Sequence, residues 1–265
     1  ANESIVTFPP KPFNMSLART VQQMYFPEFL PDDNRPLDLP GSNAADRVKG
    51  SSEAFGTLRY GKLAELLMYD CRRFITLNKT AATFIPGATE NWLINRTKSQ
   101  DVKHTIQVPS TPYGWSAGKW LEWYPDVLGE DKKLHDNLPK YLWQKGWQNQ
   151  HDRLLQNMFE TNFKKPVVIS GDIHTFASGK IYRNGNFDFS NNPINSFIAG
   201  TLGCTVFPST FRKVKTTTPN SIGMEEDFEN VEENGFSMVH IDSTSVQVKM
   251  YNYLWSRDDL NIIDN

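Results

Sequence analysis

The segment from residue 151 to residue 170 constrains the fold most, because it predicts a helix that leads directly into a buried strand. In residues 151–163 the apolar side chains recur at helical spacing on one face, and Pro166 follows where a helix would end. The sequence then stays apolar through Ile169, which is the pattern of a strand whose two faces are both covered. We therefore expect a layered α/β fold.

Other segments predict the partners of this strand. Two apolar runs flank a Tyr-Gly-Lys turn in residues 54–70, which predicts a hairpin whose second strand is buried. Thr89 can cap a helix, and the residues beyond it lead into an alternating, strand-like run. We expect an α/β sandwich with buried strands at residues 63–70, 102–108 and 166–170, further strands at 176–182 and 195–199, and a hairpin formed by 236–241 and 246–253.

The regions outside these elements have distinct compositions. Residues 1–53 are rich in proline and polar side chains around one helical stretch at 17–25, and they predict an irregular arm. Residues 54–265 predict one domain without an internal linker. Within it, the acidic stretch 225–233 predicts a loop, and the tryptophan-rich stretch 113–147 predicts packed loops with short helices that could line a pocket.

Composition excludes several classes of function. The 265 residues include 28 basic and 30 acidic side chains, so no general attraction to nucleic acid is expected and any anion must be held locally. No apolar run approaches the roughly 18 residues that a membrane-spanning helix needs. Two cysteines neither form a disulfide framework nor fix the redox compartment. The chain starts at Ala1 without a signal-like segment, so we expect a targeting peptide to be already removed or not included.

The candidate functional residues follow directly after the predicted strand at residues 166–170, in the sequence Gly171-Asp172-Ile173-His174. Open α/β sheets place their ligand crevices at the C-terminal ends of strands, which is where this sequence falls. The Asp172 carboxylate and the His174 imidazole suit a divalent metal or a phosphate bound to it. A structural interpretation stays open beside this one, in which Asp172 caps a turn and His174 is a hydrogen-bonded core residue.

Arg72 is a second candidate, because it follows the predicted buried strand that ends at Asp70. A guanidinium presents a planar fork of donors that fits phosphate oxygens. The alternative is an ion pair between Arg72 and Asp70 or another carboxylate.

Several of these segments, in the same order, resemble the alkaline phosphatase D (PhoD-like) metallophosphatase family. The Asp-X-Arg element at Asp70 and Arg72 and the Gly-Asp-X-His element are the distinctive ones. Two departures are the loss of the Trp-Asp-Gly-Tyr element after Trp147 and the presence of Cys71 where threonine is expected. The similar segments are residues 55–61, 63–73, 85–93, 146–147, 152–155, 170–174 and 235–241.

The resemblance implies a calcineurin-like metallophosphoesterase sandwich of mixed sheets flanked by helices, here lacking its N-terminal part. It implies hydrolysis of phosphate mono- or diesters by two or more divalent or trivalent metal ions, such as Ca, Fe, Mn or Zn. Asp172 and His174 would be metal ligands, His174 would also be catalytic, and Arg72 would bind substrate. The family resemblance further implies a periplasmic or secreted location.

The resemblance covers only the C-terminal half of the family's domain. The further carboxylates and the Asp-Asp-His-Glu strand end of the family have no counterpart before residue 54. We therefore expect residues 54–265 to be a C-terminal half whose remaining metal ligands come from an N-terminal half or chain. The alternatives are a catalytically silent α/β module that binds carbohydrate or another ligand through the tryptophans of residues 115–147, and a purely structural fragment.

Overall fold

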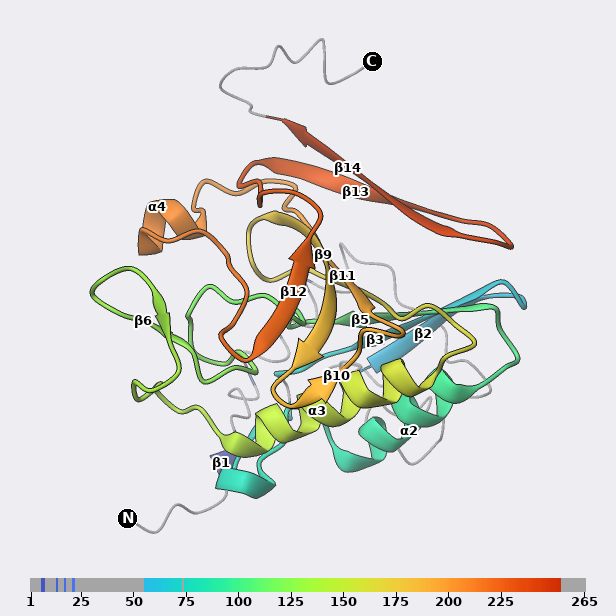
Figure 1. Cartoon of the computed structure of the whole chain (residues 1–265), viewed down its shortest axis with the longest axis horizontal. Helices are drawn as coiled ribbons and strands as arrows, with labels where there is room; N and C mark the ends of the chain where they lie inside the picture. Colours follow the sequence, from blue (N-terminus) through green and yellow to red (C-terminus); the bar gives the residue numbers. More distant parts are fainter. Residues whose placement is uncertain are drawn as a thin grey trace. The chain divides into compact units, whose positions relative to one another are not determined.

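The structure is a computed structural model that describes residues 6–7, 13, 17, 21, 55–72 and 74–253. Most of the predicted arm, including its helical stretch, lies outside the described residues. The chain divides into two compact units, and the elements are labelled in Figure 1. Unit 1 comprises Ala1–Ser110 and Gln144–Met158, and unit 2 comprises Thr111–Trp143 and Phe159–Asn265.

Unit 1 is built on strands of mixed direction. β2 (Phe55–Tyr60) and β3 (Ala64–Tyr69) form the predicted antiparallel hairpin, and β3 also pairs in parallel with β5 (His104–Pro109). The helix α2 (Gly87–Lys98) supplies the crossover from β3 to β5 that parallel pairing requires. The remaining elements are β1 (Val6–Thr7), which pairs with β4 (Thr76–Leu77), η2 (Lys79–Ala81) and most of α3 (Lys145–Glu160).

The helices of unit 1 lie next to each other (Figure 1) and are joined by a buried polar side chain. Gln150 of α3 is fully buried, and its carboxamide donates to Glu90 of α2 at 2.8 Å. The same carboxamide accepts the backbone N–H groups of Phe84 and Ile85 at 2.8 and 3.1 Å. Buried amide groups need such partners, so Gln150 fixes the chain before α2 against α3.

Unit 2 also contains strands of mixed direction. β11 (Ile194–Ala199) pairs in parallel with β8 (Val167–Ser170) and antiparallel with β9 (Phe176–Asn184). β9 also pairs antiparallel with β10 (Phe187–Asp188) and β12 (Ile222–Glu226). Smaller elements are β6 (Val127–Leu128), β7 (Leu134–His135) and α4 (Pro208–Arg212).

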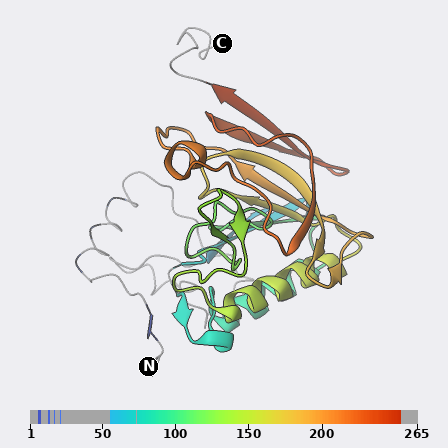
Figure 2. The ribbon, with the colours of Figure 1, turned by 60° about the vertical axis from the view of Figure 1, so that its left-hand side comes forward.

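A two-stranded ribbon completes unit 2 (Figures 1 and 2). β13 (Asn234–Ile241) and β14 (Val246–Tyr253) pair antiparallel with each other, as the sequence predicts. The ribbon is attached near the end of β11, where the Ser237 hydroxyl donates to the carbonyl of Ala199 at 3.0 Å. Phe236 and Tyr251 stack on it with ring centroids 5.2 Å apart.

The described structure confirms a mixed α/β fold and the three predicted buried strands, β3, β5 and β8. It differs in four places. α2 begins at Gly87 after Pro86, so Thr89 lies inside the helix rather than capping it. Residues 113–144 form turns and the short strands β6 and β7 rather than short helices. α3 begins at Lys145 rather than at residue 151, because its first turns bury polar side chains that give no apolar signal. Glu225 and Glu226 belong to β12 rather than to a loop, and both side chains are exposed on a strand paired with β9.

The tryptophans do not form a wall of exposed rings. Trp115 and Trp123 in unit 2 are fully buried, and Trp123 stacks on Tyr113 with centroids 5.2 Å apart. Trp147 in unit 1 is equally buried, so these three rings belong to the cores. Trp120 is 52% exposed and is available to a ligand.

Candidate functional site

The turn after β8 places the two predicted site residues on unit 2. Asp172 has a φ of 70°, a left-handed conformation that costs most residues about 1–2 kcal/mol but that aspartate tolerates. The N–H of Ile173 donates to the carbonyl of Gly171 at 2.9 Å, which closes the turn. Ile173 is buried in a cluster with Trp115 and Ile198, so packing fixes the backbone between Asp172 and His174.

Asp172 is paired with a lysine that the sequence did not single out. The Nζ of Lys119 lies 2.5 Å from Oδ2 of Asp172, and the two side chains are 25% and 13% exposed. Partial burial strengthens such a charge-assisted hydrogen bond, because less water competes for either group. The Asp172 carboxylate therefore forms an ion pair with the ammonium group of Lys119.

Glu122 holds the loop that presents Lys119. Its side chain is almost fully buried and accepts the N–H of Ala117 at 3.0 Å and the hydroxyl of Ser116 at 2.6 Å. Lys140 is buried beside it, 3.4 Å from Oε2 of Glu122. Burial lowers the pKa of Lys140 below its ordinary value, although Glu122 opposes this shift. These contacts make the loop before Lys119 part of the packed interior.

His174 is exposed, and its Nδ1 lies beside a carbonyl oxygen and a thiol sulfur. Nδ1 is 2.7 Å from the carbonyl oxygen of Val206 and 2.8 Å from the Sγ of Cys204. A carbonyl oxygen can only accept, so Nδ1 carries the hydrogen and Nε2 is left with its lone pair in the neutral ring. His174 can therefore accept or return a proton at Nε2.

The position of Cys204 is fixed by Asn234 at the start of β13. The backbone N–H of Cys204 donates to Oδ1 of Asn234 at 2.7 Å, and Nδ2 of Asn234 donates to the carbonyl of Cys204 at 3.1 Å. This pair of bonds fixes the peptide units on both sides of the Cys204 side chain. It thereby supports the contact between Cys204 and His174.

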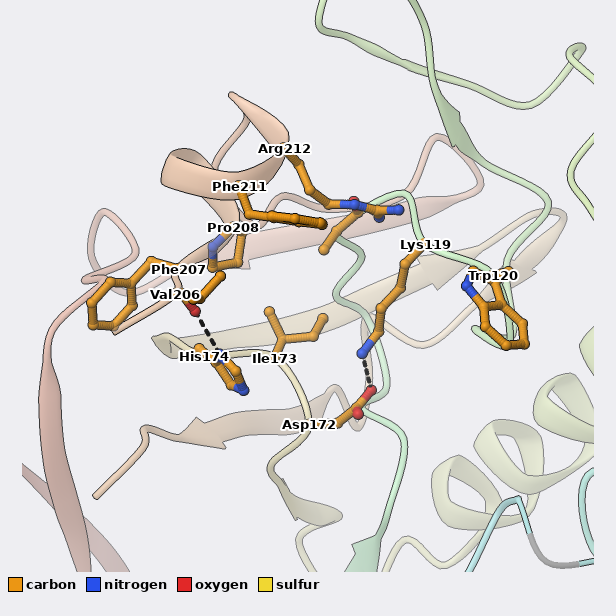
Figure 3. A pocket seen from close by; sticks show the side chains of 11 residues that line it. Lys119, Trp120, Asp172, Ile173, His174, Val206, Phe207, Pro208, Phe211 and Arg212 are labelled. Atoms are coloured by element: carbon orange, nitrogen blue, oxygen red, sulfur yellow. Dashed lines mark hydrogen bonds and ion pairs between the residues drawn. The ribbon is translucent and has the colours of Figure 1, made fainter. Parts of the chain in front are cut away.

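A cavity of about 270 Å³ opens between the β8 turn and α4 (Figure 3). Lys119, Asp172 and His174 lie on one side of it, and Arg212 extends from α4 on the other. Nη1 of Arg212 donates to the carbonyl of Ala117 at 2.6 Å, which ties α4 to the loop that carries Lys119. The other lining residues are mostly apolar: Ala117, Trp120, Ile173, Val206, Phe207, Pro208 and Phe211.

The structure brings together two of the three predicted site residues. Asp172 and His174 both line the cavity. Arg72 lies in unit 1 just after β3, where its backbone N–H donates to Oδ1 of Asp70 at 2.8 Å, and its role in substrate binding stays a prediction. Sequence reasoning missed Lys119 and Arg212, since neither residue belongs to a motif and each reaches the cavity from a separate loop or helix.

The donor set does not by itself fit the expected centre of two or more metal ions. Within residues 55–72 and 74–253, no three side chains of His, Cys, Asp or Glu gather in a group that could hold a metal. The carboxylate of Asp172 is paired with the ammonium of Lys119, and Nδ1 of His174 faces the Val206 carbonyl. The role of Asp172 and His174 as metal ligands stays a prediction that needs donors from elsewhere.

In the part of the chain that the structure describes, no helix has the length and apolar character to cross a membrane.

Comparisons with known proteins place the chain in a family. A solved structure entitled "Structure of PhoD" aligns with 11% sequence identity and a TM-score of 0.49. The alignment covers 89% of this chain but only 45% of that one. No curated protein sequence matches the chain. The sequence profile of the PhoD-like phosphatases matches residues 22–250, and the chain belongs to this family.

Proposed function

We propose that the chain takes part in hydrolysis of phosphate mono- or diesters and supplies the pocket that receives the ester. Membership of the PhoD-like phosphatase family supports a phosphoric ester hydrolase. The observation that carries the proposal is the placement of Asp172 and His174 on one cavity with Lys119 and Arg212. A cavity with two cations beside an imidazole has the groups that phosphoryl transfer needs for binding and for proton transfer.

Each polar residue has a distinct role in this proposal. Lys119 and Arg212 bind the non-bridging phosphoryl oxygens and stabilise the charge on them. Asp172 positions the ammonium of Lys119 through their 2.5 Å contact. His174, with Nδ1 held by Val206, accepts a proton from the attacking water or returns one to the leaving oxygen at Nε2.

We further propose that other catalytic groups come from a segment or chain that supplies the N-terminal half of the site. The chain spans less than half of the length of the solved structure to which it is similar. Metal ions held by that half would add Lewis-acid activation of the phosphoryl group and of water. A calcineurin-like assembly and a periplasmic or secreted location are parts of the same proposal.

The test is hydrolysis of 4-nitrophenyl phosphate and bis(4-nitrophenyl) phosphate by the chain and by any longer natural product that contains it. Replacing His174 with alanine should lower kcat by about 100-fold or more, as expected for loss of a general acid or base. His240 on β13 is exposed and does not line the cavity, so His240→Ala is the matched control. Equal rates for the two variants would refute the assignment of His174.

A catalytically silent binding module remains the second candidate. Trp120 lines the cavity and meets the exposed Tyr141 in an edge-on contact with centroids 6.3 Å apart. An exposed ring at the cavity with a second exposed ring beside it is suited to stacking on a ligand. Saturable binding of a carbohydrate that Trp120→Ala removes, with no turnover of any phosphate ester, would favour this function.

A further inference from the structure

The cavity already contains a fixed cation beside its carboxylate. A divalent ion that bound Asp172 would have to displace the ammonium of Lys119, which lies 2.5 Å from Oδ2. Displacement would leave that ammonium partly buried without its partner, which is unfavourable. The Glu122 contacts hold Ser116 and Ala117 in place, which fixes the backbone from which the Lys119 side chain extends toward Asp172.

The charge of the cavity favours an anion. Among its lining residues, Lys119 and Arg212 are positive and Asp172 is negative, which leaves one net positive charge with His174 neutral. Nη1 of Arg212 is bonded to Ala117, and the guanidinium has further N–H donors for a ligand. A tetrahedral anion can therefore be bound by two cations without a metal ion.

The remaining wall of the cavity is apolar and partly exposed. Phe211 lines the cavity although its side chain is 77% exposed, and Val206 is 47% exposed. Figure 3 shows Phe211 on the α4 side of the cavity, across from Asp172. An aromatic group on the ligand would cover these side chains and remove their apolar surface from water. The volume of about 270 Å³ suits a phosphoryl group with one aromatic ring rather than a long polymer.

We infer that this cavity binds a phosphate ester of an aromatic alcohol without a divalent metal, with Lys119 as the resident cation and Phe211 as the residue that selects the aromatic group. The choice of phosphate as the anion rests on the proposed function. The choice of cation and of apolar group rests on the contacts and lining of the cavity itself.

The first experiment is calorimetric titration of the chain with phenylphosphonate, which has no ester bond to hydrolyse, in excess EDTA. Binding should persist, with a dissociation constant that changes less than two-fold when EDTA is replaced by Ca²⁺ or Mn²⁺. Lys119→Met should raise the constant about ten-fold or more, whereas Lys119→Arg should keep most of the affinity. Lys213 is exposed, follows α4 and does not line the cavity, so Lys213→Met is the matched control and should bind like the parent.

The second experiment tests the selection of the aromatic group. Phe211→Ala should weaken phenylphosphonate binding about five-fold and leave methylphosphonate binding unchanged, because only the ring contact is removed. Phe228 is also exposed but lies outside the cavity, so Phe228→Ala should change neither constant. Circular dichroism and thermal unfolding of every variant show whether a loss of binding reflects a loss of folding, and Phe211→Leu provides a second, milder variant.

The outcomes separate this inference from the proposed function. Binding that appears only after a divalent ion is added, or that is the same in Lys119→Met and the parent chain, would overturn the inference. Equal losses for phenylphosphonate and methylphosphonate in Phe211→Ala would overturn the aromatic selection. If phenylphosphonate binds in EDTA but neither the chain nor a longer product hydrolyses any ester, the inference stands and the proposed function fails.

Discussion

Asp172 combines a charge that the cavity needs with a backbone conformation that few side chains adopt. Its carboxylate positions Lys119, and its φ is 70°. Asp172→Asn keeps a residue that tolerates this conformation, so we expect its free energy of unfolding to stay within about 1 kcal/mol of the parent. Its kcat/KM for aryl phosphates should fall about 10- to 100-fold, because one charge-assisted hydrogen bond is lost.

The matched variant is Asp172→Ala, which loses the same charge and also places alanine at a left-handed position. It should show the same kinetic loss together with about 1–2 kcal/mol of lost stability. Urea unfolding and turnover of 4-nitrophenyl phosphate separate the two effects. If Asp172→Asn keeps the parent kcat/KM, Asp172 does not position Lys119 for the reaction.

A second residue-scale prediction concerns Asp101 in unit 1. Burial would raise the pKa of Asp101, but hydrogen bonds from Ser99 and from Arg59 and Arg96 outweigh it and hold that pKa well below its ordinary value. The unfolded chain therefore takes up the proton first as the pH falls. The stabilisation is fully present above the unfolded pKa of about 3.9 and is lost as the pH falls toward the folded pKa.

Thermal unfolding between pH 5 and pH 2.5 tests this sign. The Tm of the parent should fall over this range. The Tm of Asp101→Asn should fall less, because this variant lacks the carboxyl group whose protonation favours the unfolded chain. Glu130 is exposed and lies in unit 2, so Glu130→Gln serves as a control for the loss of a carboxylate and should follow the parent. A steeper fall in Asp101→Asn than in the parent would show that the sign is wrong.

At the scale of elements, α3 packs against the chain before α2 through a residue that has no side chain. A Cβ at Gly146 would lie 2.2 Å from the carbonyl oxygen of Ala82 and 2.5 Å from its backbone nitrogen. Both atoms belong to the backbone, so neither can move aside cheaply. We expect Gly146→Ala to destabilise the chain by about 1–3 kcal/mol, although alanine favours helix by about 1 kcal/mol.

Gly87 is the control for this substitution. It is the first residue of α2, and a Cβ there would meet nothing within 4 Å. Gly87→Ala should leave the free energy of unfolding unchanged or raise it slightly. Equilibrium urea unfolding of both variants measures the difference, and a Gly146→Ala variant as stable as Gly87→Ala would mean that α3 can shift away from Ala82.

Local patterns in the sequence predicted the strands that are buried through apolar side chains. β3, β5 and β8 were predictable because their apolar runs report burial directly. The start of α3 was not, because Gln148 and Gln150 are buried through hydrogen bonding and look like surface residues in the sequence. The motif located Asp172 and His174 but not Lys119, since a pair separated by 53 positions leaves no local signal.

At the scale of the whole molecule, the described residues form a pocket, and we propose that an N-terminal half supplies further catalytic donors to it. We predict that the isolated chain releases 4-nitrophenol from 4-nitrophenyl phosphate at less than about one hundredth of the rate of a product joined to an N-terminal half. His174 alone supplies only proton transfer, while metal activation of water is a separate and large contribution. Comparable rates for the two proteins would mean that this chain holds a complete site.

The Asn234 side chain links the ribbon to the cavity, because it bonds both the N–H and the carbonyl of Cys204. We therefore expect that the Cys204 amide hydrogen exchanges when the ribbon opens. In hydrogen–deuterium exchange, the Cys204 amide should share the protection of β13, although it lies in a loop, and Asn234→Ala should release it while most of β9 stays protected. A ligand that orders the wall of the cavity would then slow exchange in a strand that it does not touch.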